Sequence, residues 1–296
     1  MLFTNEKRMN FAKDPAVAYF AGRYYLYYTI RCPEIPQTGF GMGIGVGIAV
    51  SDDGDHFTNV AEVPRTQEPE KNGIGAPAVI AVGDTLHLYY QTYGNGAKDA
   101  ICHAVSKDGI HFEKDPRNPV FAPTADWCCG RAIDADVCLF QGKLFLYFAT
   151  RDHEMKIQKV GVAVSEDFSH FTQVVPQAIL APEFLWEKAC IEAPATVEND
   201  GLLYLFYGGA YNCSPQQIGY AVSKDGVHFD KKCPAPFITN GPEGSWNQSE
   251  SGHPYAFRAP DGKAYLYYQG SADGGKTWYL SRVELLFAPD GTVTYR

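Results

Sequence analysis

A chain of 296 residues can bury a sizeable core, and 45% hydrophobic with 20% charged residues is an ordinary globular balance. The formal net charge of −9, with no run of lysine and arginine, argues against nucleic acids and anionic membranes as partners. The 19 tyrosines and 18 phenylalanines favour β-structure, and 29 glycines and 19 prolines indicate many short turns.

The start of the chain bears on where the protein works. Charged residues lie throughout residues 1–14, where a signal peptide would need an apolar core. No stretch approaches the roughly 18 consecutive apolar residues of a membrane span. We therefore expect a cytoplasmic protein with reduced, mostly buried cysteines and, because no Cys-x-x-Cys pair is present, no zinc site. The eight cysteines are Cys32, Cys102, Cys128, Cys129, Cys138, Cys190, Cys213 and Cys233.

A short apolar segment, usually with proline as its second residue, recurs five times along the chain. Its copies begin at Asp14, Ala76, Asp134, Ala193 and His253, with intervals of 62, 58, 59 and 60 residues between successive starts. So regular an interval indicates one supersecondary unit repeated along the chain.

Further strands and a turn follow each copy. The next strand is rich in tyrosine and phenylalanine, and a glycine shortly before it marks a hairpin turn. Its copies are Arg23–Thr29, Thr85–Gln91, Lys143–Thr150, Leu202–Tyr207 and Lys263–Gln269. A third, short apolar strand leads into a turn of the pattern Ser-x-Asp-x-x-His-Phe in the first four copies. We expect the histidines of this turn to be structural; they are His56, His111, His170 and His228.

Five units of four antiparallel strands predict an all-β, five-bladed β-propeller, in which each sheet packs on its neighbours around a central channel. We expect one domain over residues 1–296, with blades at about 11–62, 73–117, 130–176, 190–234 and 250–296. A two-domain β-sandwich is the structural alternative, but it gives no reason for a constant interval. The fifth copy diverges after its second strand, where residues 271–278 resemble the Asp-box turn of sialidases.

Ionisable residues recur at the start of the repeat. The first strand of a propeller blade lines the axis, so these positions should surround a common funnel. Four blades place Asp14, Asp134, Glu192 and His253 there, and blade two places Ala76. Three clustered carboxyls suit glycoside hydrolysis, because one can take a proton from water, one can protonate the leaving oxygen, and a third can raise the pKa of that donor.

Three short motifs at these positions resemble glycoside hydrolase family 43 and the related five-bladed families 32, 62, 68 and 117. They are Asp-Pro-Ala-Val from Asp14, Ile-Asp ending at Asp134 and Glu-Ala-Pro from Glu192. The resemblance implies that Asp14 is the general base, that Glu192 is the general acid and that Asp134 tunes and orients the acid. It also implies inversion, no required cofactor, and a channel histidine, His253, that helps to hold a water or a structural calcium ion.

Two features depart from the pattern of that family. Its members commonly have Trp-Ala-Pro-Asp in blade two, whereas this chain has Gly75-Ala-Pro-Ala78. Blade three also carries an extra acid, Asp136, and strand alternation would place it on the same face as Asp134. The position within the repeat favours Asp134 as the tuning residue.

Sugar contacts are expected from loops at the mouth of the funnel, because rigid blades position variable loops. The candidate substrate-binding residues are Phe40, Trp127, Arg131, Asp136, Arg151, His153, Trp186, Tyr211, Trp246, Gln248 and His253. A sialidase would instead need an arginine cluster for the sugar carboxylate. Candidates for that cluster are Arg31, Arg131, Arg151 and Arg258.

These observations predict an inverting, exo-acting glycosidase that releases a terminal α-L-arabinofuranosyl or β-xylosyl unit from short oligosaccharides. A retaining fructosidase and a glycoside phosphorylase are alternatives within the enzymes. A propeller that binds glycans without cutting them is the alternative outside the enzymes, and the altered blade-two motif is its best support.

Overall fold

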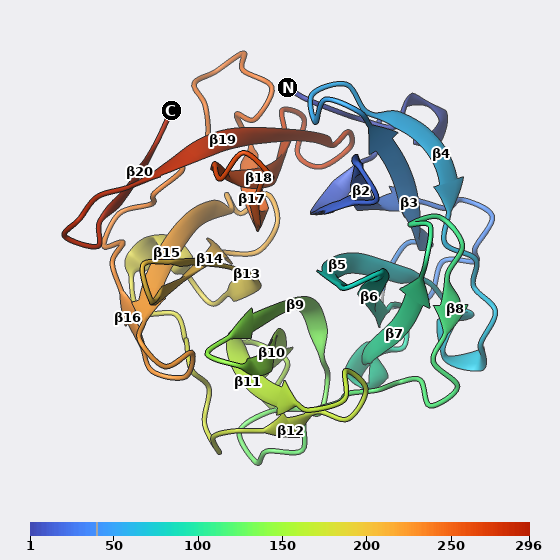
Figure 1. The fold of residues 1–296 in the computed structure, drawn as a ribbon, viewed down its shortest axis with the longest axis horizontal. Helices are drawn as coiled ribbons and strands as arrows, with labels where there is room; N and C mark the ends of the chain where they lie inside the picture. Colours follow the sequence, from blue (N-terminus) through green and yellow to red (C-terminus); the bar gives the residue numbers. More distant parts are fainter. Residues whose placement is uncertain (40) are drawn as a thin grey trace.

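The computed structural model describes residues 1–39 and 41–296, and almost all of its regular structure is β-strand. Five antiparallel sheets of four strands each surround a central axis (Figure 1). The predicted five-bladed β-propeller is therefore confirmed. The candidate Phe40 lies outside the described residues. No helix in the described part of the chain is long and apolar enough to cross a membrane.

Each blade takes four consecutive strands, with the first at the axis and the fourth at the rim (Figure 1). Blade one holds β1 (Lys13–Phe20), β2 (Arg23–Arg31), β3 (Ile44–Ser51) and β4 (Thr58–Glu62). Blade two holds β5 (Ile74–Val82), β6 (Thr85–Thr92), β7 (Ile101–Ser106) and β8 (Glu113–Lys114). Blade three holds β9 (Ile133–Phe140), β10 (Lys143–Arg151), β11 (Gln158–Ser165) and β12 (Thr172–Gln173). Blade four holds β13 (Ile191–Asn199), β14 (Leu202–Gly209), β15 (Gln217–Ser223) and β16 (Phe229–Lys231). Blade five holds β17 (Glu250–Arg258), β18 (Ala264–Ser271), β19 (Tyr279–Phe287) and β20 (Val293–Tyr295).

Tyrosines of the second strands join neighbouring blades. The Tyr27 hydroxyl donates to the carbonyl of Gly109 at 2.8 Å, and Tyr147 donates to Gly226 at 2.8 Å, so each reaches the turn of the next blade. Both rings are fully buried. A tyrosine can bury its ring between two sheets while its hydroxyl keeps a hydrogen bond, which explains the tyrosine-rich second strands.

The repeated turn is held by its own side chains. In the first four blades the histidine Nδ1 lies 2.6–2.7 Å from the aspartate Oδ2, so these histidines are structural as predicted. Blade five contains the same turn, because Ser271 Oγ donates to Asp273 Oδ1 at 3.0 Å. Thr277 Oγ1 takes the place of the histidine, 2.8 Å from Asp273 Oδ2. The segment that resembles an Asp-box is therefore the fifth copy of this turn, lengthened by one residue.

The ring closes between blade five and the start of the chain. Leu2 and Phe3 donate their N–H groups to the Leu280 carbonyl, and Trp278 N–H donates to Asn10 at 2.7 Å. The strand β1 then packs beside β17. All eight cysteines are free, and five of them are buried, in agreement with the sequence-based expectation.

Candidate active site

The inner strand of every blade has the same irregularity near its start. The pairing with the second strand shifts register there, which is the mark of a β-bulge. The residue at the bulge has a left-handed backbone, with φ between 41° and 50°, in all five blades: Asp14, Ala76, Asp134, Ala193 and His253. This conformation costs a residue with a β-carbon about 1–2 kcal/mol, so the surroundings must hold it in place.

The preceding blade supplies part of that support. A side-chain oxygen accepts the backbone N–H of four of the five bulge residues. The pairs are Thr29 with Ala76 (2.8 Å), Gln91 with Asp134 (2.6 Å), Gln216 with His253 (3.1 Å) and Gln269 with Asp14 (3.1 Å). Because each bond crosses a blade boundary, the geometry of every axial residue depends on its neighbour.

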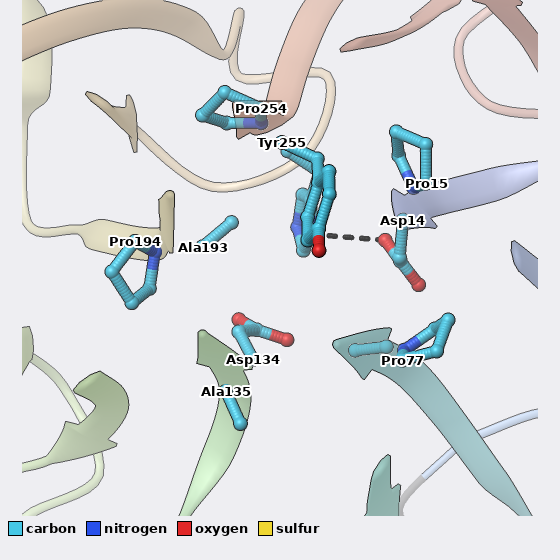
Figure 2. Close-up of a pocket in the computed structure, with 11 residues that line it drawn as sticks. Asp14, Pro15, Pro77, Asp134, Ala135, Ala193, Pro194, Pro254 and Tyr255 are labelled. Atoms are coloured by element: carbon cyan, nitrogen blue, oxygen red, sulfur yellow. Dashed lines mark ion pairs between the residues drawn. The ribbon is translucent and has the colours of Figure 1, made fainter. Parts of the chain in front are cut away.

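The bulges surround a narrow axial space of about 20 Å³ that opens into a wider cavity of about 170 Å³. Asp14, Asp134 and His253 line both spaces. Figure 2 shows the two aspartates pointing toward the centre from different inner strands, with prolines around them. Tyr255 spans the axis, and its hydroxyl donates to Val79 of blade two at 2.8 Å. The three sequence-predicted acids and His253 therefore converge on one place, since Glu192 also lines the wider cavity.

His253 lies between the proposed base and the proposed acid. Its Nδ1 is 2.9 Å from Asp14 Oδ1 (dashed line in Figure 2), and its Nε2 is 3.1 Å from Glu192 Oε1. The first contact is an ion pair rather than an aligned hydrogen bond, because no donor among the described residues is aligned with Asp14 Oδ1. Burial lowers the pKa of His253, but the charges of Asp14 and Asp134 raise it well above the ordinary value. The ring is thus an imidazolium between two carboxylates.

Positive neighbours and hydrogen-bond donors keep two of the acids ionised. Burial raises the pKa of Asp14, but Lys13, whose Nζ lies 3.9 Å from Asp14 Oδ1, and His253 together bring it below its ordinary value. Burial also raises the pKa of Glu192, and His253 and Gln216 outweigh that effect. Gln216 donates to Glu192 Oε1 at 2.6 Å, and Gln158 donates to Oε2.

Asp134 has the opposite electrostatics. Burial raises its pKa to about 7, with a further contribution from the charges of Glu192 and Asp14, although His253 opposes the rise. Within the described residues its buried Oδ2 has no hydrogen-bond partner. Near neutral pH Asp134 is therefore the carboxyl of the cluster that binds a proton most readily. The family resemblance makes Glu192 the proton donor, whereas its surroundings here hold it as a carboxylate.

The calcium ion expected near His253 stays a prediction, and the residues fit it poorly. One atom each of Asp134, Glu192 and His253 lie within 4.8 Å of one another. Calcium prefers six to eight oxygen ligands. Here both nitrogens of His253 face carboxylates, so the ring has no lone pair to offer a metal. The imidazolium itself supplies the positive charge at this point.

The predicted substrate-binding residues divide into two groups. Arg131, Arg151 and Tyr211 line the wider cavity, as His253 does. The other described candidates do not line it. Trp186 stacks on Tyr207 inside blade four, and Trp246 packs on Tyr268 in blade five, so both are core residues.

The remaining candidates belong to loops or to blade contacts. Gln248 accepts from Gly244 and donates to Ala272, and His153 Nε2 lies 2.6 Å from the Asp126 carbonyl. Trp127 has a buried indole nitrogen without a hydrogen-bond partner. Of the four arginines considered for a sugar carboxylate, Arg131 and Arg151 line the cavity and Arg31 does not. Arg258 donates to the Gly262 and Glu198 carbonyls at the far end of β17.

Asp136 is separated from Asp134, contrary to the prediction from strand alternation. The bulge in β9 opposes both Asp134 and Ala135 to the single residue Phe148 of β10, which breaks the alternation. Asp136 Oδ2 instead accepts from the backbone N–H and the hydroxyl of Thr196, at 2.8 and 2.5 Å. It therefore joins blades three and four, and it does not line the cavity.

The sequence did not reveal several residues that shape the cluster. Lys13 lies beside Asp14, and the buried Glu250 accepts from Gln269 at 3.1 Å. Gln216 holds both Glu192 and His253, and a β-carbon at Gly252 would collide with its carboxamide. Gly252 follows a Glu-Ser pair in the inner strand of blade five. A glycine inside a strand often marks the close approach of another group, so this glycine was a signal in the sequence of the contact with Gln216.

Comparisons with known proteins identify the family of the chain. The family described as glycosyl hydrolases family 43 matches residues 51–292. A thermostable family-43 glycoside hydrolase superposes with a TM-score of 0.79 over 96% of this chain and 92% of that one, at 22% identity. For an endo-1,4-beta-xylanase from Bacteroides thetaiotaomicron VPI-5482 the TM-score is 0.76, with 96% and 94% covered at 20% identity.

A curated relative is similar over a shorter stretch. A beta-1,2-mannobiose phosphorylase from Thermoanaerobacter sp. (strain X514) is 26% identical in an alignment 134 positions long that covers 40% of this chain and 42% of that protein. The chain thus aligns with less than half of this relative's length. The family match, by contrast, runs from blade one into blade five, and the fold agrees over nearly the whole chain. The chain is therefore a glycoside hydrolase and belongs to glycosyl hydrolase family 43.

Proposed function

We propose that this glycoside hydrolase inverts the anomeric centre and removes one terminal sugar, an arabinofuranosyl or xylosyl unit, from an oligosaccharide. The observation that carries the proposal is the position of His253 between Asp14 and Glu192, with contacts of 2.9 and 3.1 Å on either side of the ring. An imidazole between the carboxylates favours the wider spacing of roughly 6.5–9.5 Å used by inverting enzymes over the roughly 5–5.5 Å of retaining enzymes.

In this proposal Asp14 acts on the water. Its low pKa keeps it ionised, so it can accept the proton of a water that attacks the anomeric carbon. The water fits between base and acid only if the two carboxylates stay apart, and the imidazolium of His253 keeps them apart. His253 is thus a positioning residue for both groups.

Glu192 and Asp134 together supply the proton for the leaving oxygen. Their nearest ligand atoms lie within 4.8 Å, and Asp134 holds a proton near neutral pH. We propose that the two carboxyls share this proton as a dyad and that Glu192 delivers it to the glycosidic oxygen. This arrangement reconciles the role implied for Glu192 with its ionised state.

The proposal of exo action places one terminal sugar unit in the cavity of about 170 Å³ beside the axis. Tyr255 spans the axis and so limits entry to one side.

Two substitutions and one product analysis test the proposal. Asp14→Asn and Glu192→Gln should each lower kcat by roughly 10²–10⁴-fold, while Glu198→Gln, at the exposed end of the same strand as Glu192, should leave kcat unchanged. Substrates would be a panel of nitrophenyl glycosides, and circular dichroism would verify the fold. Near-normal turnover in both site variants would remove the proposal.

Proton NMR of the first-formed anomer would separate inversion from the retention expected of a fructosidase. A rate that depends on inorganic phosphate would reveal a phosphorylase. Sugar binding without any product after prolonged incubation would identify a glycan-binding propeller.

A further inference from the structure

Besides the imidazolium of His253, three cations line the cavity of a chain whose net charge is −9: Lys13, Arg131 and Arg151. Lys13 is engaged by the base, because its Nζ lies 3.9 Å from Asp14 and 4.5 Å from the centre of the Trp278 ring. The two arginines belong to blade three, beside Asp134 and away from Asp14. Whether either guanidinium group can bind an anionic ligand depends on the side chains that it already contacts.

Arg151 is fixed but has no anionic partner in the described part of the chain. Its Nε donates to Gln158 Oε1 at 2.8 Å, and its guanidinium lies 5.0 Å from the centre of the Tyr211 ring. Gln158 also donates to Glu192, so the guanidinium is linked through one amide to the proposed acid. The two terminal nitrogens of Arg151 remain available in a preorganised position, which is the arrangement that arginine uses to bind oxyanions.

Arg131 stands at the same edge of blade three. It is buried, and its Nε and Nη2 both lie 3.3 Å from Asp99 Oδ2, which leaves Nη1 without an acceptor among the described residues. Cys129 N–H donates to the Arg151 carbonyl at 2.9 Å, so the segment before β9 runs along the end of β10. The two guanidinium groups thus belong to one wall of the cavity.

A neutral ligand would leave the charge of the Arg151 guanidinium on this wall without an anionic partner. A sugar that fills the cavity removes water from Arg151, and removing water from an arginine without a counter-charge is unfavourable. A carboxylate or phosphate oxygen on the ligand would remove that cost and form charge-assisted hydrogen bonds. The wall adjoins Asp134 and Glu192, which act on the leaving oxygen, so the negative group belongs to the substrate rather than to the attacking nucleophile.

We propose that Arg151 and Arg131 form an oxyanion subsite, and that the preferred substrate carries an acidic group, such as the carboxylate of a uronic acid, next to the bond that is cleaved. This inference rests on the proposed hydrolytic function. It names the chemical class of the substrate, an acidic oligosaccharide, which the family assignment leaves open.

The test compares matched substrates. For wild type, kcat/KM would be measured on a neutral disaccharide, on its counterpart with a uronic acid as the leaving unit, and on a counterpart with a sugar phosphate there. We expect a preference of roughly tenfold to a hundredfold for an acidic form, corresponding to one or two charged hydrogen bonds. The better of the two acidic substrates identifies the source of the oxyanion.

The variants assign the preference to the subsite. Arg151→Gln should bring the ratio of acidic to neutral kcat/KM close to one, Arg151→Lys should restore part of it, and Arg258→Gln, at the far end of β17, should leave it unchanged. Equal kcat/KM values in wild type, or an unchanged ratio in Arg151→Gln, would overturn the inference. If the enzyme forms a sugar phosphate from the neutral substrate and inorganic phosphate, the subsite binds the attacking nucleophile. That result would also overturn the inference.

A binding measurement separates this failure from failure of the proposed function. Titration calorimetry of glucuronic acid and glucose against Asp14→Asn needs no turnover. Tighter binding of the acid, lost in the double variant Asp14→Asn with Arg151→Gln, supports the subsite even if no hydrolysis occurs. Equal binding of the two sugars contradicts it.

Discussion

Blade two and blade four are built on the same plan, yet only blade four places a carboxylate, that of Glu192, in the cavity. Ala76 and Ala193 occupy the same bulge with the same left-handed backbone, and a proline follows each. Neither alanine has a side chain that could take part in a reaction. The strain at the axis therefore belongs to the fold, which bends every inner strand at this point, and not to catalysis.

The two blades also share a buried side-chain cluster, here called the latch. In blade two, Glu70 accepts from the Tyr90 hydroxyl at 2.6 Å and from Lys114 at 2.9 Å. In blade four, Glu187 accepts from Tyr207 and from Lys231, both at 2.7 Å. In both blades the second carboxylate oxygen caps the turn of 3-10 helix that leads to the inner strand. The latch thus sets where each of these inner strands begins.

The blades differ one residue before the bulge, where blade two has Gly75 and blade four has Glu192. A β-carbon at Gly75 would approach Ile44 Cδ1 to 2.6 Å, so a side chain there would require the end of the Ile44 side chain to move. At Glu192, amides of blades three and four surround the carboxylate. A repeated scaffold thus provides equivalent positions, and the packing of the neighbouring blade decides which of them can carry an acid.

The largest expected effect tests whether the latches are equivalent. Glu70→Gln and Glu187→Gln each leave a lysine that is 7% exposed without its carboxylate. Each should lower the free energy of unfolding by about 3–5 kcal/mol in urea titrations. Glu68→Gln, which breaks an exposed pair with Lys71, should change it by less than about 1 kcal/mol. A large loss from only one of the two latch variants would show that the blades are not equivalent.

A smaller effect is the pH dependence of stability that follows from the raised pKa of Asp134, in contrast to the ionised Glu192. The pKa of Asp134 is about 7 in the folded protein and lower in the unfolded chain, so folding favours its protonated form. That contribution is complete at pH values below the ordinary pKa of aspartate and is lost as the pH rises toward 7. Asparagine does not titrate, so Asp134→Asn should gain roughly 1–4 kcal/mol relative to wild type between pH 4.5 and 7.5. A constant difference in urea titrations across this range would place the proton elsewhere.

The bulges themselves should contribute little when altered. Ala76→Gly and Ala193→Gly relieve about 1–2 kcal/mol of left-handed strain and lose about 0.5–1 kcal/mol through the greater freedom of glycine in the unfolded chain. Each should therefore stabilise the protein by between about 0 and 1.5 kcal/mol, measured as a small rise in Tm. A fall in Tm for either variant would mean that the alanine methyl group packs better than its strain costs.

The smallest expected effect concerns metal. Because both nitrogens of His253 face carboxylates, dialysis against a chelator should change neither kcat nor Tm. Lost activity that calcium restores would show that an ion, rather than the imidazolium, supplies the positive charge between Asp14 and Glu192.

Much of the fold was predictable because the repeat is local. Strand, turn and interval can each be recognised from a few neighbouring residues, so the five blades and the axial positions of Asp14, Asp134, Glu192 and His253 followed from the phase of the repeat. The fifth turn was missed for an equally local reason. One additional residue before Trp278 and threonine in place of histidine hide the pattern, although Ser271 and Asp273 form the same hydrogen bond.

The sequence by itself determined the five-bladed ring and the set of axial acids. The tertiary structure alone decided which way Asp136 points, because the bulge in β9 reverses the alternation. It also placed Trp186 and Trp246 in the core and set the charge states of Asp14, Asp134 and Glu192. The physical reason is that burial and ionisation depend on side chains such as Lys13 and Gln216, which meet the acids only after blades distant in sequence have packed together.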